Sequence, residues 1–401
     1  MVSPMTHLEL VTDRRSMSKD TGPNHSPDAV SGFLDALRRL APLIRERRDA
    51  FDALRRLPDE VFEALADAGL FRLWLPKAIG GPELSPFEFM RVIEAASAID
   101  GSVGWLIANG GGMSRAGGYV GRAVARDWFA DPRGFLAAAT GAIGTATPVK
   151  GGYRVTGRWP FGSGAHHASR FMVLAAEAPG APTLCCYAGR EDVTIIDNWH
   201  VLGLRGTGSC DFELNDVFVP DAHAHPFLDL TPSDPGLIYR MPAGSIFPWS
   251  ISAVPLGIAR GAIDAFVEYA SRKGSGASAS LRDREAVQAT VGRAEAMHRA
   301  ARAGLVEAMT ELVAAMDTGG ERLVTARAMF RVAPAHATET AVSIIDMLAA
   351  SAGSASIFET CPIERAVRDV RAVAKHVALA PGNYVVAGRV GLGLGPGTAR
   401  F

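Results

Sequence analysis

A serine between glycines and a histidine near the C-terminus are the side chains of this sequence best suited to chemistry. Ser163 lies in Phe161-Gly162-Ser163-Gly164, where the flanking glycines let the backbone approach a planar ring. His376 follows a long helical region, and a neutral imidazole can take a proton from a weakly acidic substrate and return it. Each has an ordinary alternative: a turn serine that bonds its own backbone, or a histidine satisfied by a neighbouring carbonyl.

Aromatic, hydroxyl and cationic side chains could complete a site for a flat cofactor. Trp159 and Trp199 could form walls for a planar ring, although Trp159 could equally belong to a β-domain core. Arg272 could bind a phosphate across a subunit interface, or lie free on the surface. The candidate cofactor-binding residues are Trp159, Phe161, Ser163, Trp199, Arg205, Thr207, Ser209 and Arg272. Trp105 and Asn109 are candidate substrate-pocket residues.

Composition and motifs exclude several other classes of function. A formal net charge of −1 indicates neither a nucleic-acid partner nor an anionic membrane surface. The four cysteines form no CxxC pair, and the adjacent His166 and His167 have no third ligand at metal-site spacing, so we predict no metal centre. No GxGxxG motif follows a strand pattern. The polar N-terminus lacks a signal-peptide core, which favours a cytoplasmic protein with reduced thiols.

The order of the expected elements predicts an α+β protein with its pocket at a domain junction. We expect a disordered tail at 1–27, a helical domain at 28–138, a β domain with a linker at 139–240 and a helical bundle at 241–401. Alternation and turn residues predict strands at 153–159, 171–175, 193–196, 211–214 and 217–219. Ala-rich stretches predict a four-helix bundle from 253–272, 281–317, 321–333 and 335–352.

Several segments, in this order, resemble the acyl-CoA dehydrogenases and their flavin monooxygenase relatives. They are Gly151–Gly164, Leu202–Ser209, Asp216–Pro220, Pro255–Ala262 and Pro362–Asp369. The resemblance covers about residues 29–391. It implies N-terminal helices, a small central β-barrel or sandwich and a C-terminal four-helix bundle.

The two branches of this superfamily differ in their catalytic groups. A dehydrogenase needs a carboxylate base, but the two positions that the resemblance offers are Thr360 and Phe247, with Glu359 only adjacent. His376, seven residues beyond Asp369, is similar to the active-site acid/base of two-component aromatic hydroxylases that act on hydroxyphenylacetate, steroid-derived phenols and dibenzothiophene. In that branch, the serine that corresponds to Ser163 contacts flavin N5.

The hydroxylase branch implies a cofactor, a co-substrate and partners. We expect reduced FMN, or loosely bound reduced FAD, to react with O2 through a C4a-hydroperoxide and hydroxylate a small, aromatic substrate. The stretch after Arg272 lacks the Phe of the dehydrogenases' Arg-x-x-Phe-Gly motif, and no nicotinamide motif is present. A separate NAD(P)H:flavin reductase and a homotetramer are therefore implied. The alternatives are an acyl-CoA dehydrogenase, an N-hydroxylase of an amine or amino sugar, and a non-catalytic binding protein.

Overall fold

The computed structural model describes residues 27–228, 231–272, 280–398 and 401. The predicted N-terminal tail therefore lies, except for its last residue, outside the described part of the chain. So does the Gly/Ser-rich stretch that follows Arg272.

Helices occupy the N-terminal part of the chain. They are α2 (Pro27–Glu46), α3 (Arg48–Leu54), α4 (Asp59–Asp67), α5 (Pro86–Ile99), α6 (Gly101–Met113) and α7 (Arg122–Trp128). Helix α5 begins with a capping box, in which the Glu88 amide donates to Ser85 Oγ (3.3 Å) and the Ser85 amide donates to Glu88 Oε2 (2.8 Å). Asp100 caps α6 by accepting from two backbone amides, so α5 and α6 meet at a sharp corner.

A seven-stranded sheet follows, in the order β5-β6-β2-β1-β3-β4-β7, with β1 and β3 parallel and the other neighbours antiparallel. The strands are β1 (Leu136–Val149), β2 (Gly152–Gly162), β3 (Arg170–Ala176), β4 (Leu184–Gly189), β5 (Thr194–Ile196), β6 (Cys210–Pro220) and β7 (Ala224–Pro226). The prediction of two strands at 211–214 and 217–219 is wrong. They form one strand that bulges at Asp216, which has φ 53°. Strands β1, β4 and β7 were not predicted.

Long helices form the C-terminal part, after the short α8 (Leu237–Arg240) and α9 (Ala243–Ser252). They are α10 (Val254–Ser271), α11 (Glu285–Met316), α12 (Gly320–Ala352), α13 (Glu364–Val373) and α14 (Gly382–Gly391). The predicted helix break near Pro334 is wrong, because α12 runs through it. The missing amide costs one helical hydrogen bond, but Pro334 is buried and both halves of α12 bury apolar residues, which outweighs that loss.

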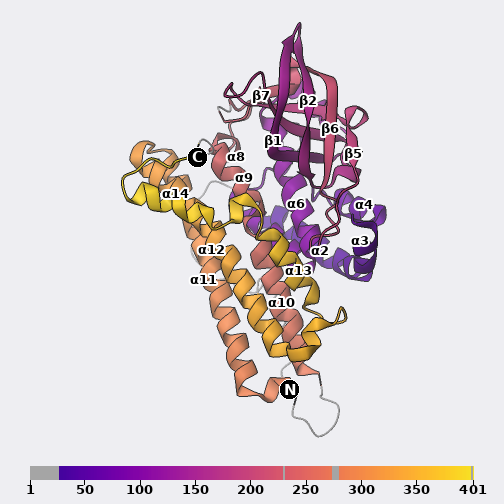
Figure 1. Ribbon diagram of the computed structural model, residues 1–401, viewed down its shortest axis with the longest axis vertical. Helices are drawn as coiled ribbons and strands as arrows, with labels where there is room; N and C mark the ends of the chain where they lie inside the picture. Colours follow the sequence, from indigo (N-terminus) through magenta and orange to yellow (C-terminus); the bar gives the residue numbers. More distant parts are fainter. Residues whose placement is uncertain (1–26, 229–230, 273–279, 399–400) are drawn as a thin grey trace.

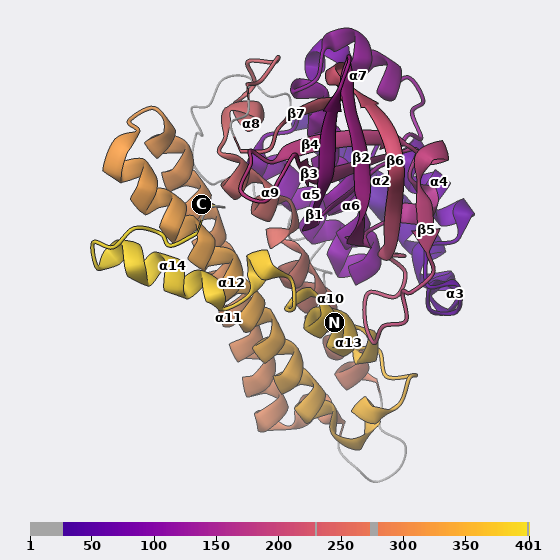
Figure 2. The ribbon, with the colours of Figure 1, turned by 45° about the horizontal axis from the view of Figure 1, so that its top comes forward.

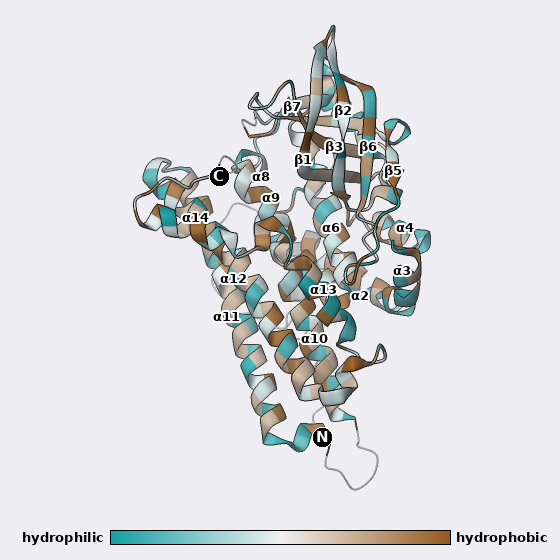
Figure 3. Cartoon of the chain, in the orientation of Figure 1, coloured by the Kyte–Doolittle hydropathy of each residue, from teal (hydrophilic) through white to brown (hydrophobic). Residues whose placement is uncertain are grey.

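The helical parts meet the sheet along α6. The sheet lies at one end of the molecule, and α10–α12 extend to the other end (Figure 1). In the turned view α5 and α6 lie behind the strands, and α6 packs against β1 (Figure 2). Apolar residues gather where α6, α9 and α10 meet (Figure 3). The architecture is the predicted α+β arrangement of N-terminal helices, a central sheet and C-terminal helices.

The close contact between α5 and α6 yields a stability prediction. A Cβ at Gly104 would lie 1.9 Å from Ser97 Oγ and 2.7 Å from Ser97 Cα, so Gly104→Ala must push the two helices apart. We expect a loss of about 1–3 kcal/mol in the free energy of unfolding. The matched control is Gly292→Ala on the exposed side of α11, where nothing lies within 4 Å and alanine should stabilise by about 0.5–1 kcal/mol. Thermal unfolding of both variants checks this; equal melting temperatures would contradict it.

Candidate functional site

A chain of hydrogen bonds joins α6 to the end of β2 and to the loop before β6. The indole N–H of Trp105 donates to Ser163 Oγ at 2.9 Å. Ser163 Oγ lies 2.8 Å from Ser209 Oγ, which lies 2.7 Å from Thr207 Oγ1. Thr207 Oγ1 donates to the Leu204 carbonyl at 2.8 Å. Sequence segments separated by about a hundred residues therefore meet at the predicted serine.

The protons of this chain can be assigned one by one. Thr207 has one hydroxyl proton and donates it to a carbonyl, so Thr207 must accept from Ser209. Ser209 then has no proton left for Ser163 and must accept from it. Ser163 consequently donates to Ser209 and accepts from Trp105, and its remaining lone pair can only accept. Ser163 thus presents an acceptor, and no donor, to any further partner.

Two aromatic rings stand beside this serine. Phe161 is 65% exposed and has φ 65°, a backbone conformation that is uncommon for a bulky residue and typical of functional sites. The ring of the half-buried Trp199 meets it edge-on at 6.3 Å, and the Trp199 indole N–H donates to the Leu204 carbonyl at 3.3 Å. Phe161 therefore offers an open apolar face next to a hydrogen-bond acceptor.

The prediction that Trp159 could form a cofactor wall is wrong, and its alternative as a core residue holds. Trp159 is fully buried, its indole N–H donates to the Leu174 carbonyl at 2.9 Å, and its ring packs on Phe212. Simple strand alternation would place residues 159 and 161 on the same face. The register shift between Trp159 and Gly162, together with the positive φ of Phe161, breaks that alternation.

Asp369 holds the loop that carries Thr207 and Ser209. Its Oδ1 accepts from the Leu204 amide at 2.6 Å, across the gap between α13 and the sheet. Burial and the nearby negative charge of Asp100 raise the pKa of Asp369 to about 7. The motif Arg368-Asp369 was noticed in the sequence, but this role was not predicted, because the spacing along α13 carries no information about a partner 165 residues away.

His376 lies just beyond the end of α13, close to Trp105. The two rings meet edge-on at 5.6 Å, so the structure brings His376 to the same junction as Ser163. Burial lowers the pKa of His376 to about 4, so the ring is neutral at ordinary pH. Nδ1 accepts from the Ala378 amide at 3.2 Å, which assigns the ring proton to Nε2.

The remaining predicted residues lie at varied distances from this junction. Asn109 is half-buried one turn along α6 from Trp105, and its Nδ2 donates to the Trp105 carbonyl at 2.8 Å. Arg205 points away from the hydroxyl chain, donating to the Val201 carbonyl and lying 3.9 Å from Asp52. Arg272 is exposed at the end of α10 and pairs with Glu268.

The two positions considered for a dehydrogenase base lie in different places. Thr360 and the adjacent Glu359 are exposed in the connection before α13, at the opposite end of that helix from His376. Phe247, on α9, stacks under the Arg115 guanidinium at 3.9 Å. Neither position places a carboxylate beside Ser163.

The described residues contain no cluster of three or more His, Cys, Asp and Glu side chains that could hold a metal ion. His166 lies 3.5 Å from Cys210 Sγ, and His167 stacks on Phe62 and contacts the Leu57 carbonyl. All four cysteines are buried and free.

The junction fits a reduced flavin. An exposed aromatic face for a planar ring, an acceptor for a ring N–H, and a loop of amides and hydroxyls for a polar edge lie together where the end of β2 meets α6 and the loop before β6. Ser163, Phe161, Trp199, Thr207 and Ser209 are the residues that would hold it. Reduced flavin has an N–H at N5, which matches an oxygen that can only accept.

Comparison with known proteins gives the family. Models of the acyl-CoA dehydrogenase N-terminal and C-terminal domains match residues 28–117 and 249–381. The chain is 34% identical over 389 residues to the oxygenase subunit HsaA of a flavin-dependent monooxygenase from Mycobacterium tuberculosis, covering 92% of this chain and 97% of that protein.

Solved structures agree with this match. The fold is similar to that of 3-HSA hydroxylase from Rhodococcus sp. RHA1, with a TM-score of 0.84, 31% identity and coverage of 92% of this chain and 99% of that chain. It is also similar to XiaF from Streptomyces sp. in complex with FADH2 and glycerol, with a TM-score of 0.83, 27% identity and coverage of 92% and 97%. The chain belongs to the oxygenase components of two-component flavin-dependent monooxygenases, which hydroxylate aromatic substrates with reduced FAD or FMN on an acyl-CoA dehydrogenase fold.

Proposed function

We propose that this oxygenase hydroxylates a small phenolic substrate at the junction of α6, β2 and α13, with Ser163 selecting reduced flavin and His376 orienting the substrate. The observation that carries the proposal is the one-way hydrogen-bond chain that leaves Ser163 only an acceptor. When bound, reduced flavin supplies an activated oxygen atom from O2. The residues of this chain hold the reactants together and keep water out.

Ser163 favours the reduced cofactor for an electrostatic reason. Oxidised flavin carries a lone pair at N5, which would face the lone pair of Ser163 without a proton between them. Reduced flavin carries a proton there and forms a hydrogen bond. A hydrogen bond that retains the N5 proton also opposes its loss with peroxide, so oxygen transfer to the substrate is favoured.

His376 acts as a hydrogen-bond donor in this proposal. A base at Nε2 would require the tautomer with the proton at Nδ1, and that tautomer loses the bond from the Ala378 amide. With its pKa lowered by burial, the neutral ring instead presents Nε2–H. It can orient a phenolic oxygen without taking its proton. The sequence suggested that His376 takes a proton from the substrate, whereas this geometry favours orientation of the substrate by a donated hydrogen bond.

An oxygenase component implies a separate reductase, and we infer that it uses NAD(P)H, because the sequence has no nicotinamide motif of its own. We also infer a cytoplasmic location, where the four buried cysteines stay reduced.

We further infer a homotetramer that assembles through the C-terminal helices. Two stretches, Ala243–Ser271 and Gly320–Ile357, are long and apolar enough to cross a membrane, but the first is 78% buried within the fold and the second 33%. Exposed apolar side chains lie on α12, on α14 and in the connections next to these helices, which fits contacts between copies of the chain. They are Val324, Met329, Ile357, Phe358, Val377, Val385, Leu392 and Leu394.

Ser163→Ala tests the function directly. The variant should still bind reduced FMN, but more of the consumed O2 should leave as hydrogen peroxide and less should appear in a hydroxylated phenol. Rapid mixing of protein, reduced FMN and oxygenated buffer, with product and peroxide both quantified, gives this ratio. Ser169→Ala, whose hydroxyl contacts only the Phe135 carbonyl, is the control. An unchanged ratio would remove Ser163 from the mechanism; no oxygenated product from the parent protein with any phenol would remove the proposed function.

Thr207→Val tests the direction of the hydrogen-bond chain. Valine has no oxygen to accept the Ser209 proton, so the hydrogen bond between Ser209 and Ser163 can reverse. Ser209 then donates to Ser163, and the Ser163 proton is free for the N5 lone pair of oxidised flavin. We expect the preference for reduced over oxidised FMN, measured as a ratio of anaerobic and aerobic dissociation constants, to fall by about 10-fold, the worth of one hydrogen bond. Thr310→Val, on the exposed side of α11, should leave the ratio unchanged.

His376→Gln and His376→Ala separate a donor from a base. Glutamine can place an N–H near the Nε2 position but cannot take a proton, so His376→Gln should keep most of the oxygenation, whereas His376→Ala should lose about 10- to 100-fold. Because the pKa of His376 is lowered to about 4, its neutral form prevails above that pH. The parent and the Gln variant should therefore have the same pH profile between about pH 5.5 and 8. Equal loss in both variants, with a parental limb near neutral pH, would restore His376 as a base.

A further inference from the structure

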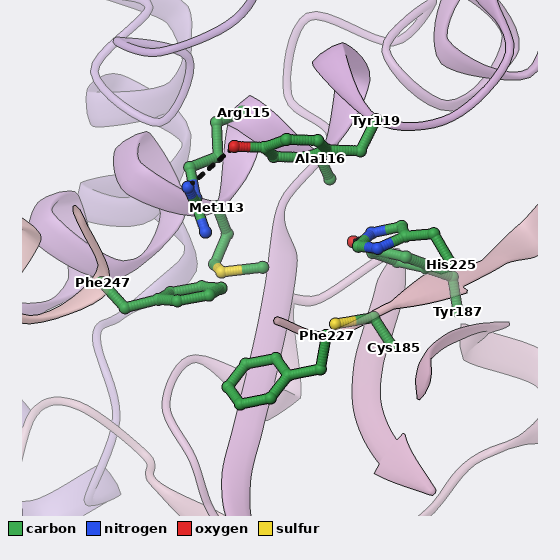
Figure 4. Close-up of a pocket in the computed structure, with 9 residues that line it drawn as sticks. All are labelled: Met113, Arg115, Ala116, Tyr119, Cys185, Tyr187, His225, Phe227 and Phe247. Atoms are coloured by element: carbon green, nitrogen blue, oxygen red, sulfur yellow. Dashed lines mark hydrogen bonds between the residues drawn. The ribbon is translucent and has the colours of Figure 1, made fainter. Parts of the chain in front are cut away.

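A small cavity lies at the far end of α6, between the turn that follows this helix, strands β4 and β7, and α9 (Figure 4). Arg115 points into it from one side, and Tyr187 and His225 stand on the other. Neither the family fold nor the hydroxyl chain at Ser163 accounts for a cationic side chain in this place.

Arg115 is buried without a counter-charge. It is 2% exposed, its Nη1 donates to the Tyr119 hydroxyl at 3.1 Å, and its guanidinium stacks on Phe247. No Asp or Glu carboxylate lies within 4.0 Å of it among the described residues. Among the described residues Arg260 is the other buried arginine, and it pairs with both Asp264 and Glu295.

The neighbouring polar groups do not neutralise this charge. The Tyr119 hydroxyl donates a hydrogen bond to the Tyr239 carbonyl at 3.1 Å. His225 Nδ1 contacts the Pro226 carbonyl at 2.8 Å and therefore carries the ring proton, so Nε2 accepts from the Tyr187 hydroxyl at 2.9 Å. Burial lowers the pKa of His225, which keeps it neutral. The guanidinium is thus the positive charge of the cavity, with N–H groups left over for a ligand.

A buried cation without a partner is costly, and stacking on an aromatic ring offsets only part of that cost. A bound anion would remove it. The cavity has a volume of about 10 Å³, about the room that one water molecule needs. That is tight, and together with a single positive charge it favours a small monoanion over a phosphate.

One face of α6 reaches both the flavin junction and the cavity. Trp105, Asn109 and Met113 are four residues apart and share one face of α6, with Trp105 at Ser163 and Met113 in the cavity wall. Eight residues of helix span about 12 Å. Met113, a flexible side chain in the cavity wall, can move aside for a ligand that extends along this face of the helix.

We propose that Arg115 binds a carboxylate of the substrate, so that the preferred substrate is a phenolic acid whose carboxylate is several atoms from the ring. The inference rests on the proposed function, because it takes the ring to lie beside Ser163 and His376. It makes Arg115 a specificity-determining residue at the end of the pocket remote from the chemistry.

The test uses a homologous series of ω-(4-hydroxyphenyl)alkanoic acids and their primary amides as probes. Titration calorimetry on the flavin-free protein should show that one chain length of acid binds about 10- to 100-fold more tightly than its amide, the range for a charge-assisted hydrogen bond. Arg115→Met should abolish this difference, and Arg115→Lys should keep part of it. Arg170→Met, which removes an arginine stacked on Trp128 outside the cavity, should leave the difference intact.

Arg115→Met should remain folded, because methionine replaces an unpaired buried charge with an apolar chain of similar length. Its melting temperature should therefore not fall. An acid-to-amide ratio that is the same in the parent and in Arg115→Met overturns the inference. Oxygenation of the series with reduced FMN separates the two levels of the argument. If phenols are hydroxylated but acids and amides serve equally well, Arg115 has no such role and the proposed function stands. If acids bind through Arg115 and no phenol is oxygenated, the proposed function fails and the binding site stands.

Discussion

The hydrogen bond from the Trp105 indole to Ser163 Oγ ties the N-terminal helices to the sheet at the point where we propose that the flavin binds. The direction of the later bonds is set at the other end of the chain, because Thr207 donates its hydroxyl proton to the Leu204 carbonyl, which can only accept. Three hydroxyls between two fixed ends leave one arrangement of protons. The electronic character of Ser163 is therefore decided by residues that need not touch a ligand.

The same chain depends on the C-terminal helices. The Leu204 amide is held by Asp369, so α13 fixes the loop whose carbonyl ends the chain. Around it, Asp52 accepts from Arg365 and Arg368, and Arg48 lies 3.3 Å from Asp100, so several charges are buried or half-buried in the seam. Removing one member of this network would leave its charged partner buried and unpaired, so the charged residues where α13 meets the N-terminal helices depend on one another.

The sequence was informative where local patterns determine structure. The α+β order of helices, sheet and helices followed from spacing and turn residues. It failed where distant segments decide. Trp159 is buried in the core while Phe161 is exposed, because of a register shift with β6, and Asp216 bulges a strand that looked like two. Pro334 continues a helix because buried neighbours on both sides hold it. The role of Asp369 and the isolation of Arg115 depend on the three-dimensional neighbours of each residue.

Helix α6 has almost no room for change. Every residue from Gly101 to Met113 is buried except Asn109, which is half-buried, and added side-chain atoms at Gly104 or Gly110 would collide with Ser97 or Phe135. Substitutions on this helix that alter what the pocket accepts without disturbing buried packing therefore fall at Asn109. Divergence of substrate range among descendants of this protein, in nature or under laboratory selection, would pass through Asn109, while the rest of α6 would be inherited almost unaltered.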